Sequence, residues 1–341
     1  MRQTYLKISF VFFTILLVAG CGKNRYEVDL TGLEADIELI RFEDRLVGLS
    51  EDEIETGYEA LHSEHELITE ALVEQIIGAG RASSPNMSLI RRFCQDTIHQ
   101  QIVRDVQKAY PDVSFIEADL EEAFKRLQYY FPNDTVPTRA YTVFTRFAGP
   151  GFTYAGIVGV SLDWYMGQDY KYYHPQMMPE YMQRRMTREY ITPQVIKGYF
   201  TNKYPIARHT DGTLLSEMIY YGRMLEFTKM LMPHLDDATI IEYTGKNLEW
   251  CIENEALIFG HFVEKKLFFS TDHMQTSRYV SDGPYTVAPD VPIESAPRLG
   301  WWIGWNIVKG YIENEGLEDA DVFFGSNDFN EIFKKSRYKP E

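Results

Sequence analysis

Hydrophobic residues recur at three- and four-residue steps over most of this chain, which is the spacing of one buried face of an α-helix. The pattern predicts helices over residues 51–78, 88–109, 116–130, 193–203, 212–231, 246–266, 298–313 and 327–335. Three segments predict strands instead, at residues 37–42, 140–147 and 154–162. The sequence Ala148-Gly149-Pro150-Gly151 predicts a hairpin turn between the last two. We therefore expect an α+β fold that is predominantly helical, with a small sheet.

The chain shows no linker rich in Pro, Gly or Ser and no internal repeat. We therefore predict a single domain over residues 37–341. Residues 21–36 have no clear periodicity, and we expect them to be a tether.

The first twenty residues have the three parts of an export signal. Arg2 and Lys7 are positive, residues 8–18 are almost entirely apolar, and small residues follow. Eleven apolar residues are too few for a confident membrane span, which needs about 20. The sequence Val18-Ala19-Gly20-Cys21 resembles the bacterial lipobox, which implies cleavage before Cys21 and lipid on that cysteine. The alternative is an ordinary signal peptide with an incidental cysteine.

The residues after Cys21 bear on which membrane holds the lipid. Gly22, Lys23 and Asn24 include no acidic residue, which favours the outer membrane over retention in the inner one. We therefore expect a protein of the cell envelope, anchored in the inner leaflet of an outer membrane and facing the periplasm.

The amino-acid composition limits which classes of partner the protein can bind. The chain has 341 residues and a formal net charge of −16, which argues against nucleic acid as a partner. No second apolar run approaches membrane-spanning length, so we expect a soluble body. Cys94 and Cys251 are far apart in the sequence, and we expect both to be buried thiols.

Two carboxylates occupy apolar surroundings in the predicted helices. Glu217 lies among Leu214, Tyr220 and other apolar residues, and Glu255 shares a helical stripe with Ile252 and Phe259. A buried carboxylate is costly unless something pairs with it. Each glutamate is therefore either ion-paired or partly exposed, or else it serves as a ligand or catalytic group.

Residues 298–311 are apolar on nearly every side, which is typical of a buried helix. Gly300 and Gly304 are four residues apart and share one face, so we expect another helix to approach closely there. We expect Trp301, Trp302 and Trp305 to lie in the core rather than to form a ligand platform.

No metal or cofactor motif is complete. His65-Glu66 begins like the zinc-binding HExxH pattern, but Thr69 holds the second histidine position. We interpret His62 and His65 as part of a solvated helix face. The chain contains no P-loop, Rossmann fingerprint or GxSxG elbow, so we predict no cofactor and no metal.

Blocks along the whole mature chain resemble the gliding motility lipoprotein GldB family of the Bacteroidetes. Beside the lipobox cysteine, the matching blocks are IELIRFEDRL (37–46), YAGIVGVSLDWYMG (154–167), LLSEMIYYGRMLEF (214–227), NLEWCIENEALIFGHFVEKKLFFSTD (247–272), APRLGWWIGWNIVKGYI (296–312) and EIFKKSRYKP (331–340). The resemblance implies an envelope lipoprotein associated with gliding motility and the linked type IX secretion machinery.

The layout is also similar to that of gluzincin metallopeptidases, in which one helix carries HExxH and a second supplies a glutamate ligand. The HExxH position here holds Ser216-Glu217-Met218-Ile219-Tyr220. In this resemblance, Glu217 matches the general base and Glu255 the third zinc ligand, while Ser216 and Tyr220 replace the histidines. The resemblance implies a pseudo-metallopeptidase in which Glu255 is hydrogen-bonded to Tyr220 or Ser216.

Three functions follow as hypotheses. The first is a non-catalytic envelope lipoprotein that acts through protein partners or a small ligand. The second is a zinc-dependent, peptidase-like hydrolase using Glu217 and Glu255. The third is a lipoprotein that binds carbohydrate or peptide, for which the many aromatic residues are the argument.

Overall fold

The computed structural model describes residues 25–340, and it has the α+β architecture, predominantly helical, that the sequence predicts. The export signal and the lipid attachment at Cys21 lie outside the described residues. The sheet has the order β1-β2-β4-β3. Its strands are β1 (Glu38–Arg41), β2 (Arg139–Val143), β3 (Gly151–Tyr154) and β4 (Ile157–Ser161). Strands β1, β2 and β4 are parallel, and β3 runs antiparallel to β4 along the edge.

The predicted hairpin turn at residues 148–151 is wrong. The two strands that it was expected to join, β2 and β4, are parallel neighbours, so a tight turn cannot connect them. The hairpin lies instead between β3 and β4, where Ala155 and Gly156 have φ values of 46° and 87°. Positive φ at both central residues is the geometry that matches the right-handed twist of paired strands.

Most helices follow the predicted ranges, but the range 51–78 is divided at His65 and the range 88–109 at Asp96, and the structure adds several short helices. Their bounds are α1 (Ile54–Glu64), α2 (Glu66–Glu70), α3 (Met87–Gln95), α4 (Thr97–Ala109), α5 (Ser114–Tyr130), α6 (Glu180–Gln183), α7 (Ile191–Lys203), α8 (Leu214–Leu231), α9 (Asp237–Ile241), α10 (Gly245–Glu253), α11 (Glu255–Glu264), α12 (His273–Thr276), α13 (Leu299–Glu315), α14 (Ala320–Gly325) and α15 (Phe329–Ser336). A π-helical segment, Ala71–Ile77, follows α2.

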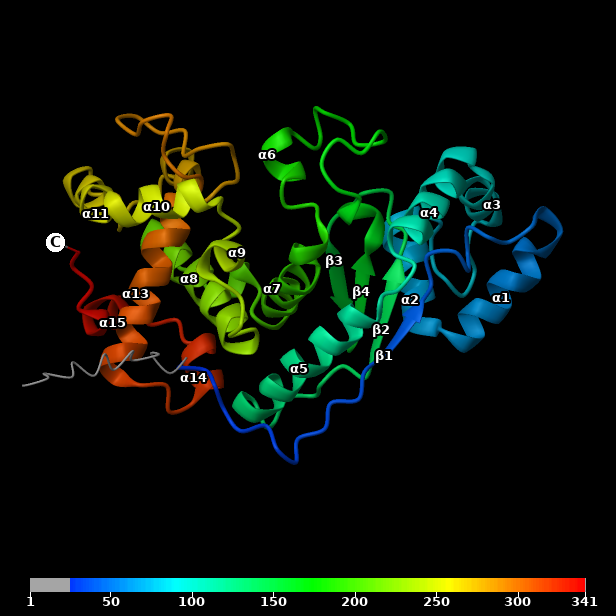
Figure 1. Cartoon of the computed structure of the whole chain (residues 1–341), viewed down its shortest axis with the longest axis horizontal. Helices are drawn as coiled ribbons and strands as arrows, with labels where there is room; N and C mark the ends of the chain where they lie inside the picture. The colour runs from blue at the N-terminus through cyan, green and yellow to red at the C-terminus, as the bar shows by residue number, and fades with distance from the viewer. Residues whose placement is uncertain (1–24, 341) are drawn as a thin grey trace, which may run out of the picture.

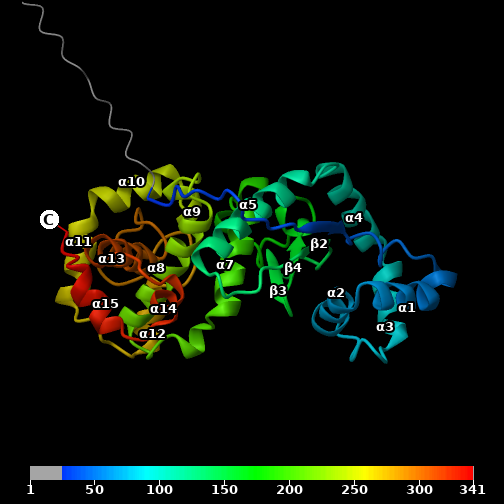
Figure 2. The ribbon, with the colours of Figure 1, turned by 90° about the horizontal axis from the view of Figure 1, so that it is seen from below.

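The molecule is elongated, with the sheet near its middle (Figure 1). Helices α1–α4 lie at one end, and α8–α15 gather at the other, as the view from below also shows (Figure 2). Helix α7 packs against β3 and β4 and also against α8, so it joins the sheet to the C-terminal helices. The central part of the molecule is therefore where segments distant in sequence meet.

The C-terminal helices are built on the close packing of α8 against α13. A Cβ placed on Gly304 of α13 would overlap the Met218 carbonyl group and lie only 3.0 Å from the Met218 Cα. A Cβ on Gly222 of α8 would lie 2.7 Å from the backbone nitrogen of Trp305. The predicted close approach at Gly304 is thus confirmed. A Cβ on Gly300 would lie 2.9 Å from the Tyr279 carbonyl oxygen and 3.4 Å from the Met218 side chain of α8.

Part of the segment predicted as a tether lies against the folded body. Tyr26 is buried, its hydroxyl donates a hydrogen bond to the Glu226 carboxylate, and its carbonyl accepts one from Arg126 at 2.8 Å. The second oxygen of Glu226 accepts a hydrogen bond from Trp305 Nε1 at 2.6 Å. The first described residues of the chain therefore pack against the body of the protein, at the contact between α8 and α13.

Both cysteines of the body are free thiols in the core, as expected. Burial raises the pKa of Cys94 to about 12, and burial together with the nearby Glu255 raises that of Cys251 to about 12. Neither thiol is therefore a thiolate at neutral pH.

The single helix predicted over residues 246–266 is in fact two. Asn254 leaves the helical conformation, with φ −111° and ψ 13°, and its side-chain amide donates to the Trp250 carbonyl. The apolar stripe expected to contain Glu255 is therefore interrupted. Ile252, one of its members, is 60% exposed.

Candidate functional site

The residues that the sequence places at the histidine positions of the HExxH pattern, Ser216 and Tyr220, form hydrogen bonds with the backbone. Ser216 is buried near the start of α8, where Thr213 caps the helix. Its hydroxyl donates to the Thr213 carbonyl at 2.8 Å and accepts from the Asp211 amide at 3.2 Å. The buried Tyr220 hydroxyl donates to the Tyr204 carbonyl at 2.9 Å.

The two glutamates that were expected in a metallopeptidase-like layout, Glu217 and Glu255, have different neighbours. Glu217 is half-buried, and its Oε2 has no hydrogen-bond partner within residues 25–340. Burial raises the pKa of Glu217, and the nearby His273 opposes that shift. Glu255 accepts a hydrogen bond from the Tyr338 hydroxyl at 2.8 Å.

The expected pairing of Glu255 with Tyr220 or Ser216 is therefore wrong. The break at Asn254 starts a new helix, α11, at Glu255, and the C-terminal residues of the chain supply its partner. Glu217 and Glu255 therefore do not share the one site that the resemblance to metallopeptidases had implied. Glu255 belongs to a contact with Tyr338, and Glu217 to the surroundings of α8 and His273.

The interpretation of His62 and His65 as one solvated face is wrong for His65. The backbone leaves the helical conformation at His65, which directs that side chain into the core, where it contacts Arg45 and the Phe42 ring. His62 remains partly exposed. Within the part of the chain that the structure describes, His62, Glu66 and Glu70 are the one group of at least three His, Cys, Asp or Glu residues whose possible metal-ligating atoms all lie within 4.8 Å of one another.

A pocket of about 430 Å³ opens where α6 and α7 face the C-terminal helices. One part of its wall is apolar, formed mainly by Trp164, Met182, Met186, Met224 and Trp301. The other part is charged, formed by Arg185, Lys197, Glu242, Asp282 and Arg298. We name these five charged residues the basic cluster, because three of them are cations and two are carboxylates.

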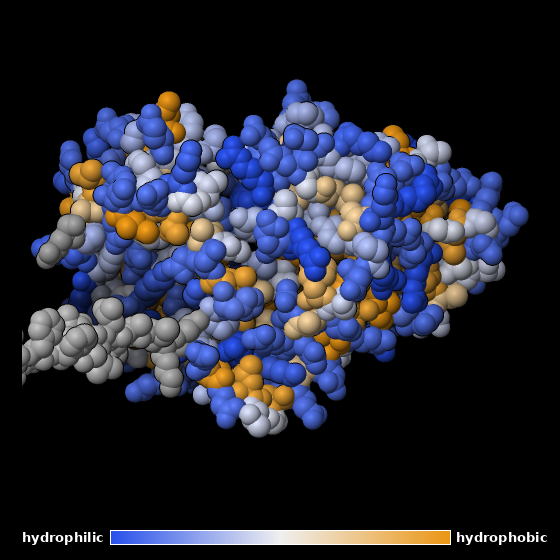
Figure 3. Space-filling model, in the orientation of Figure 1, coloured by the Kyte–Doolittle hydropathy of each residue, from blue (hydrophilic) through white to orange (hydrophobic). Residues whose placement is uncertain are grey.

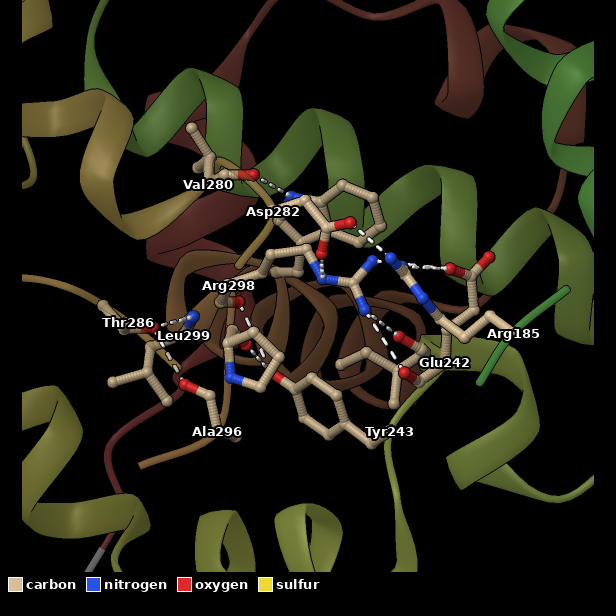
Figure 4. A network of polar contacts seen from close by, with 12 residues as sticks. Arg185, Glu242, Tyr243, Val280, Asp282, Thr286, Ala296, Arg298 and Leu299 are labelled. Atoms are coloured by element: carbon tan, nitrogen blue, oxygen red, sulfur yellow. Dashed lines mark hydrogen bonds and ion pairs between the residues drawn. The ribbon is translucent and has the colours of Figure 1, made fainter. Parts of the chain in front are cut away.

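Glu242 contacts all three cations of the basic cluster, and Figure 4 shows it beside Arg185 and Arg298. Its carboxylate accepts hydrogen bonds from Lys197 Nζ at 2.6 Å and from Arg185 Nη1 at 2.8 Å. Arg298 Nη1 lies 3.6 Å from the same carboxylate. The side chains of Glu242, Lys197 and Arg298 are all less than 10% exposed. Because these charged groups are removed from water, they interact strongly with one another.

Asp282 is the second carboxylate. Arg185 Nη2 donates a hydrogen bond to it, and Arg298 Nε lies 3.6 Å from its Oδ1. Arg185 thus bridges the two carboxylates, as Figure 4 shows. With three cations and two carboxylates, the described residues of the basic cluster carry one net positive charge.

Several contacts fix the position of Arg298. It precedes α13 with a left-handed backbone, φ 53°, and its Nη2 donates to the Ile241 carbonyl at 2.9 Å. The Tyr243 hydroxyl donates to the carbonyl of the preceding Pro297 at 2.6 Å. The Arg298 guanidinium also lies over the Trp301 ring, 4.4 Å from its centroid. It is therefore held by backbone, aromatic and charged groups together.

The basic cluster controls the ionisation of Glu242. Burial alone would raise the pKa of this carboxyl, but Lys197, Arg185 and Arg298 together hold it far below its ordinary value. Burial also lowers the pKa of Lys197, because desolvation outweighs the attraction of Glu242. Glu242 is therefore ionised throughout the physiological range of pH.

The tryptophans divide between core and pocket. Trp302 and Trp305 are buried, as expected. Trp301 is only partly buried and lines the pocket, where it stacks on Tyr221 at a centroid distance of 4.5 Å. The prediction that all three tryptophans lie in the core is therefore confirmed for Trp302 and Trp305 and wrong for Trp301.

Sequence reasoning did not find this pocket. Its charged residues come from α6 to α7, from the turn after α9 and from the segment before α13, and no short motif connects them. The one available signal was an arginine, Arg298, directly before an apolar helix.

Comparison with known proteins gives a family match. A family model described as gliding motility protein GldB matches residues 23–340. No curated protein and no solved structure matches the chain. Among the described residues, every helix is too short or too polar to cross a membrane.

Proposed function

Because this chain belongs to the family of the gliding motility protein GldB, we propose that it is a non-catalytic, lipid-anchored protein of the cell envelope. It acts in gliding motility, the linked type IX secretion or another envelope assembly, through protein partners. Its anchor is lipid on Cys21 in the outer membrane, with the body facing the periplasm. The observation that carries this proposal is the family match, which covers nearly the whole chain after Cys21.

The arrangement around α8 supports a non-catalytic role. A zinc peptidase needs three protein ligands and an open position for water. Ser216 and Tyr220, at the two histidine positions, are buried and hydrogen-bonded to backbone groups. Stoichiometric zinc in the purified protein, with peptide cleavage that is lost in Glu217→Gln, would contradict this part of the proposal.

An apolar surface supports protein partners. Helices α10 and α11 expose large hydrophobic side chains, with Leu257 72% exposed and Val263 54% exposed. Figure 3 shows apolar residues gathered at this edge of the molecule. A surface where such residues gather is typical of protein interaction sites.

Photocrosslinking in the native envelope tests the partner hypothesis. A photoreactive amino acid replaces Leu257, and a matched variant carries it at Ile98, which is also exposed but lies on α4 at the other end of the molecule. We expect adducts with motility or secretion components from the Leu257 position only. Equal labelling at both positions, or adducts with neither class of protein, would contradict the proposal.

The lipid anchor has its own test. Cys21→Ser should release the protein from the membrane fraction without unfolding it. A variant that stays membrane-bound would contradict the anchor.

A further inference from the structure

The pocket described above has an excess of positive charge in a protein whose formal net charge is −16. We propose that it binds the carboxylate of a small organic anion with an apolar body, the carboxylate being held by the basic cluster. This inference does not depend on the role proposed for the chain in the envelope.

The first argument is the charge. Arg185, Lys197 and Arg298 face Glu242 and Asp282, so one cation lacks a matching carboxylate among the described residues. Uncompensated charge is costly in a buried site. A single carboxylate would restore neutrality, whereas a phosphate dianion would bring one charge too many.

The second argument is unused hydrogen-bonding capacity. Arg298 is 2% exposed, and its Nε lies 3.6 Å from Asp282 Oδ1, which is too far for a hydrogen bond, with no acceptor within hydrogen-bond distance in the described part of the chain. Lys197 has three donors, and its ammonium group makes one hydrogen bond to a described residue, Glu242. Buried donors without acceptors are destabilising. Both residues line the pocket, where an entering carboxylate could accept from them.

The third argument is the shape and the lining. A pocket of about 430 Å³ falls within the usual size of small-molecule sites. Trp164, Trp301 and Met224 form apolar wall beside the basic cluster. This combination favours a ligand with a charged end and an apolar body. Two sources have that chemistry, a free organic acid and the C-terminal carboxylate of a peptide.

Titration calorimetry on the lipidated protein in nanodiscs tests the proposal. The probes are hexanoate, the peptide N-acetyl-Ala-Ala-Leu, the same peptide as its C-terminal amide, and inorganic phosphate. We expect hexanoate or the free peptide to bind, and the amide and phosphate not to bind. Binding of hexanoate alone identifies free acids as the source, and binding of the peptide alone identifies a peptide C-terminus.

Two variants locate the binding. Lys197→Met removes the excess charge. Gly198→Leu fills the pocket from α7, and a Cβ at this position would have no described atom within 4 Å apart from its chain neighbours and its own helix backbone, so we expect it to fold. The matched control is Gly260→Leu on α11, where the space is equally open. Each pocket variant should weaken binding at least roughly tenfold, and the control should not.

Several outcomes would overturn the proposal. It fails if neither carboxylate probe binds, if phosphate or the amide binds as well as the acids do, or if Gly198→Leu binds as tightly as the parent protein. Loss in Lys197→Met alone does not suffice, because that change could disturb the fold. Gly198→Leu must also lose binding while it keeps the unfolding midpoint of the parent protein.

Discussion

The contact between α8 and α13 gives the sharpest test of the packing argument, through Gly304→Ala. The added methyl group would overlap the Met218 carbonyl group and come within 3.0 Å of its Cα. These are backbone atoms, so no side-chain rotation can relieve the overlap. The two helices must separate, and the packing of Trp305 and its neighbours between them must loosen.

The expected loss of stability follows from two opposing effects. Overpacking a well-filled core costs about 1–3 kcal/mol, and a collision with backbone belongs at the upper end. Replacing glycine by alanine inside a helix stabilises the folded protein by about 1 kcal/mol. We therefore expect Gly304→Ala to lower the free energy of unfolding by about 2 kcal/mol, a large share of the roughly 5–15 kcal/mol typical of a folded protein.

Urea denaturation followed by circular dichroism measures this loss. The control is Gly260→Ala on α11, where the added carbon would have no described atom within 4 Å apart from its chain neighbours and its own helix backbone. We expect the control to match the parent protein or to gain up to about 1 kcal/mol. If Gly304→Ala were as stable as the control, the close approach of α8 and α13 would not constrain the fold.

Three further results are expected. Tyr26→Phe removes the hydrogen bond to the buried Glu226 carboxylate and should cost about 1.5–3 kcal/mol in a urea titration. Cys94 and Cys251 should not react with a thiol reagent until denaturant is added, because both are buried with raised pKa values. Burial raises the pKa of Asp163 to about 6, above its unfolded value of 3.8. The contribution of its protonated carboxyl to the free energy of unfolding should therefore be full below pH 4 and lost as pH rises through 6. Asp163→Asn should flatten the dependence of the free energy of unfolding on pH between these values.

The long helices could be predicted from the sequence because each buries one face. The range 212–231 became Leu214–Leu231, and 116–130 became Ser114–Tyr130. Their periodic apolar positions specify the helix before any tertiary contact is considered. Short helices such as α9 and α12 are four or five residues long, which is too short for a period to be visible.

The errors arose where one local signal competed with another. Gly and Pro at residues 148–151 suggested a turn, but the chain there leads into β3, and the true turn uses Ala155, a residue that rarely adopts positive φ. Asn254 gave little sign that it would end α10. The partner of Glu255 could not be predicted at all, because Tyr338 is 83 residues away in the sequence.

The basic cluster could not be predicted from the sequence, because its residues are far apart along the chain. The backbone conformation of two of its residues gives further information about its role. Glu242 and Arg298 both adopt left-handed conformations, with φ values of 61° and 53°. For residues with a Cβ, that conformation costs about 1–2 kcal/mol each, in addition to the cost of burying their charges. A cluster that served only to join helices could be replaced by apolar packing at lower cost. Strain and buried charge that coincide at the wall of a pocket are typical of functional sites, where a fixed geometry matters more than stability. The left-handed backbones of Glu242 and Arg298 thus add a geometric observation to the excess charge and the unused donors that support a binding role.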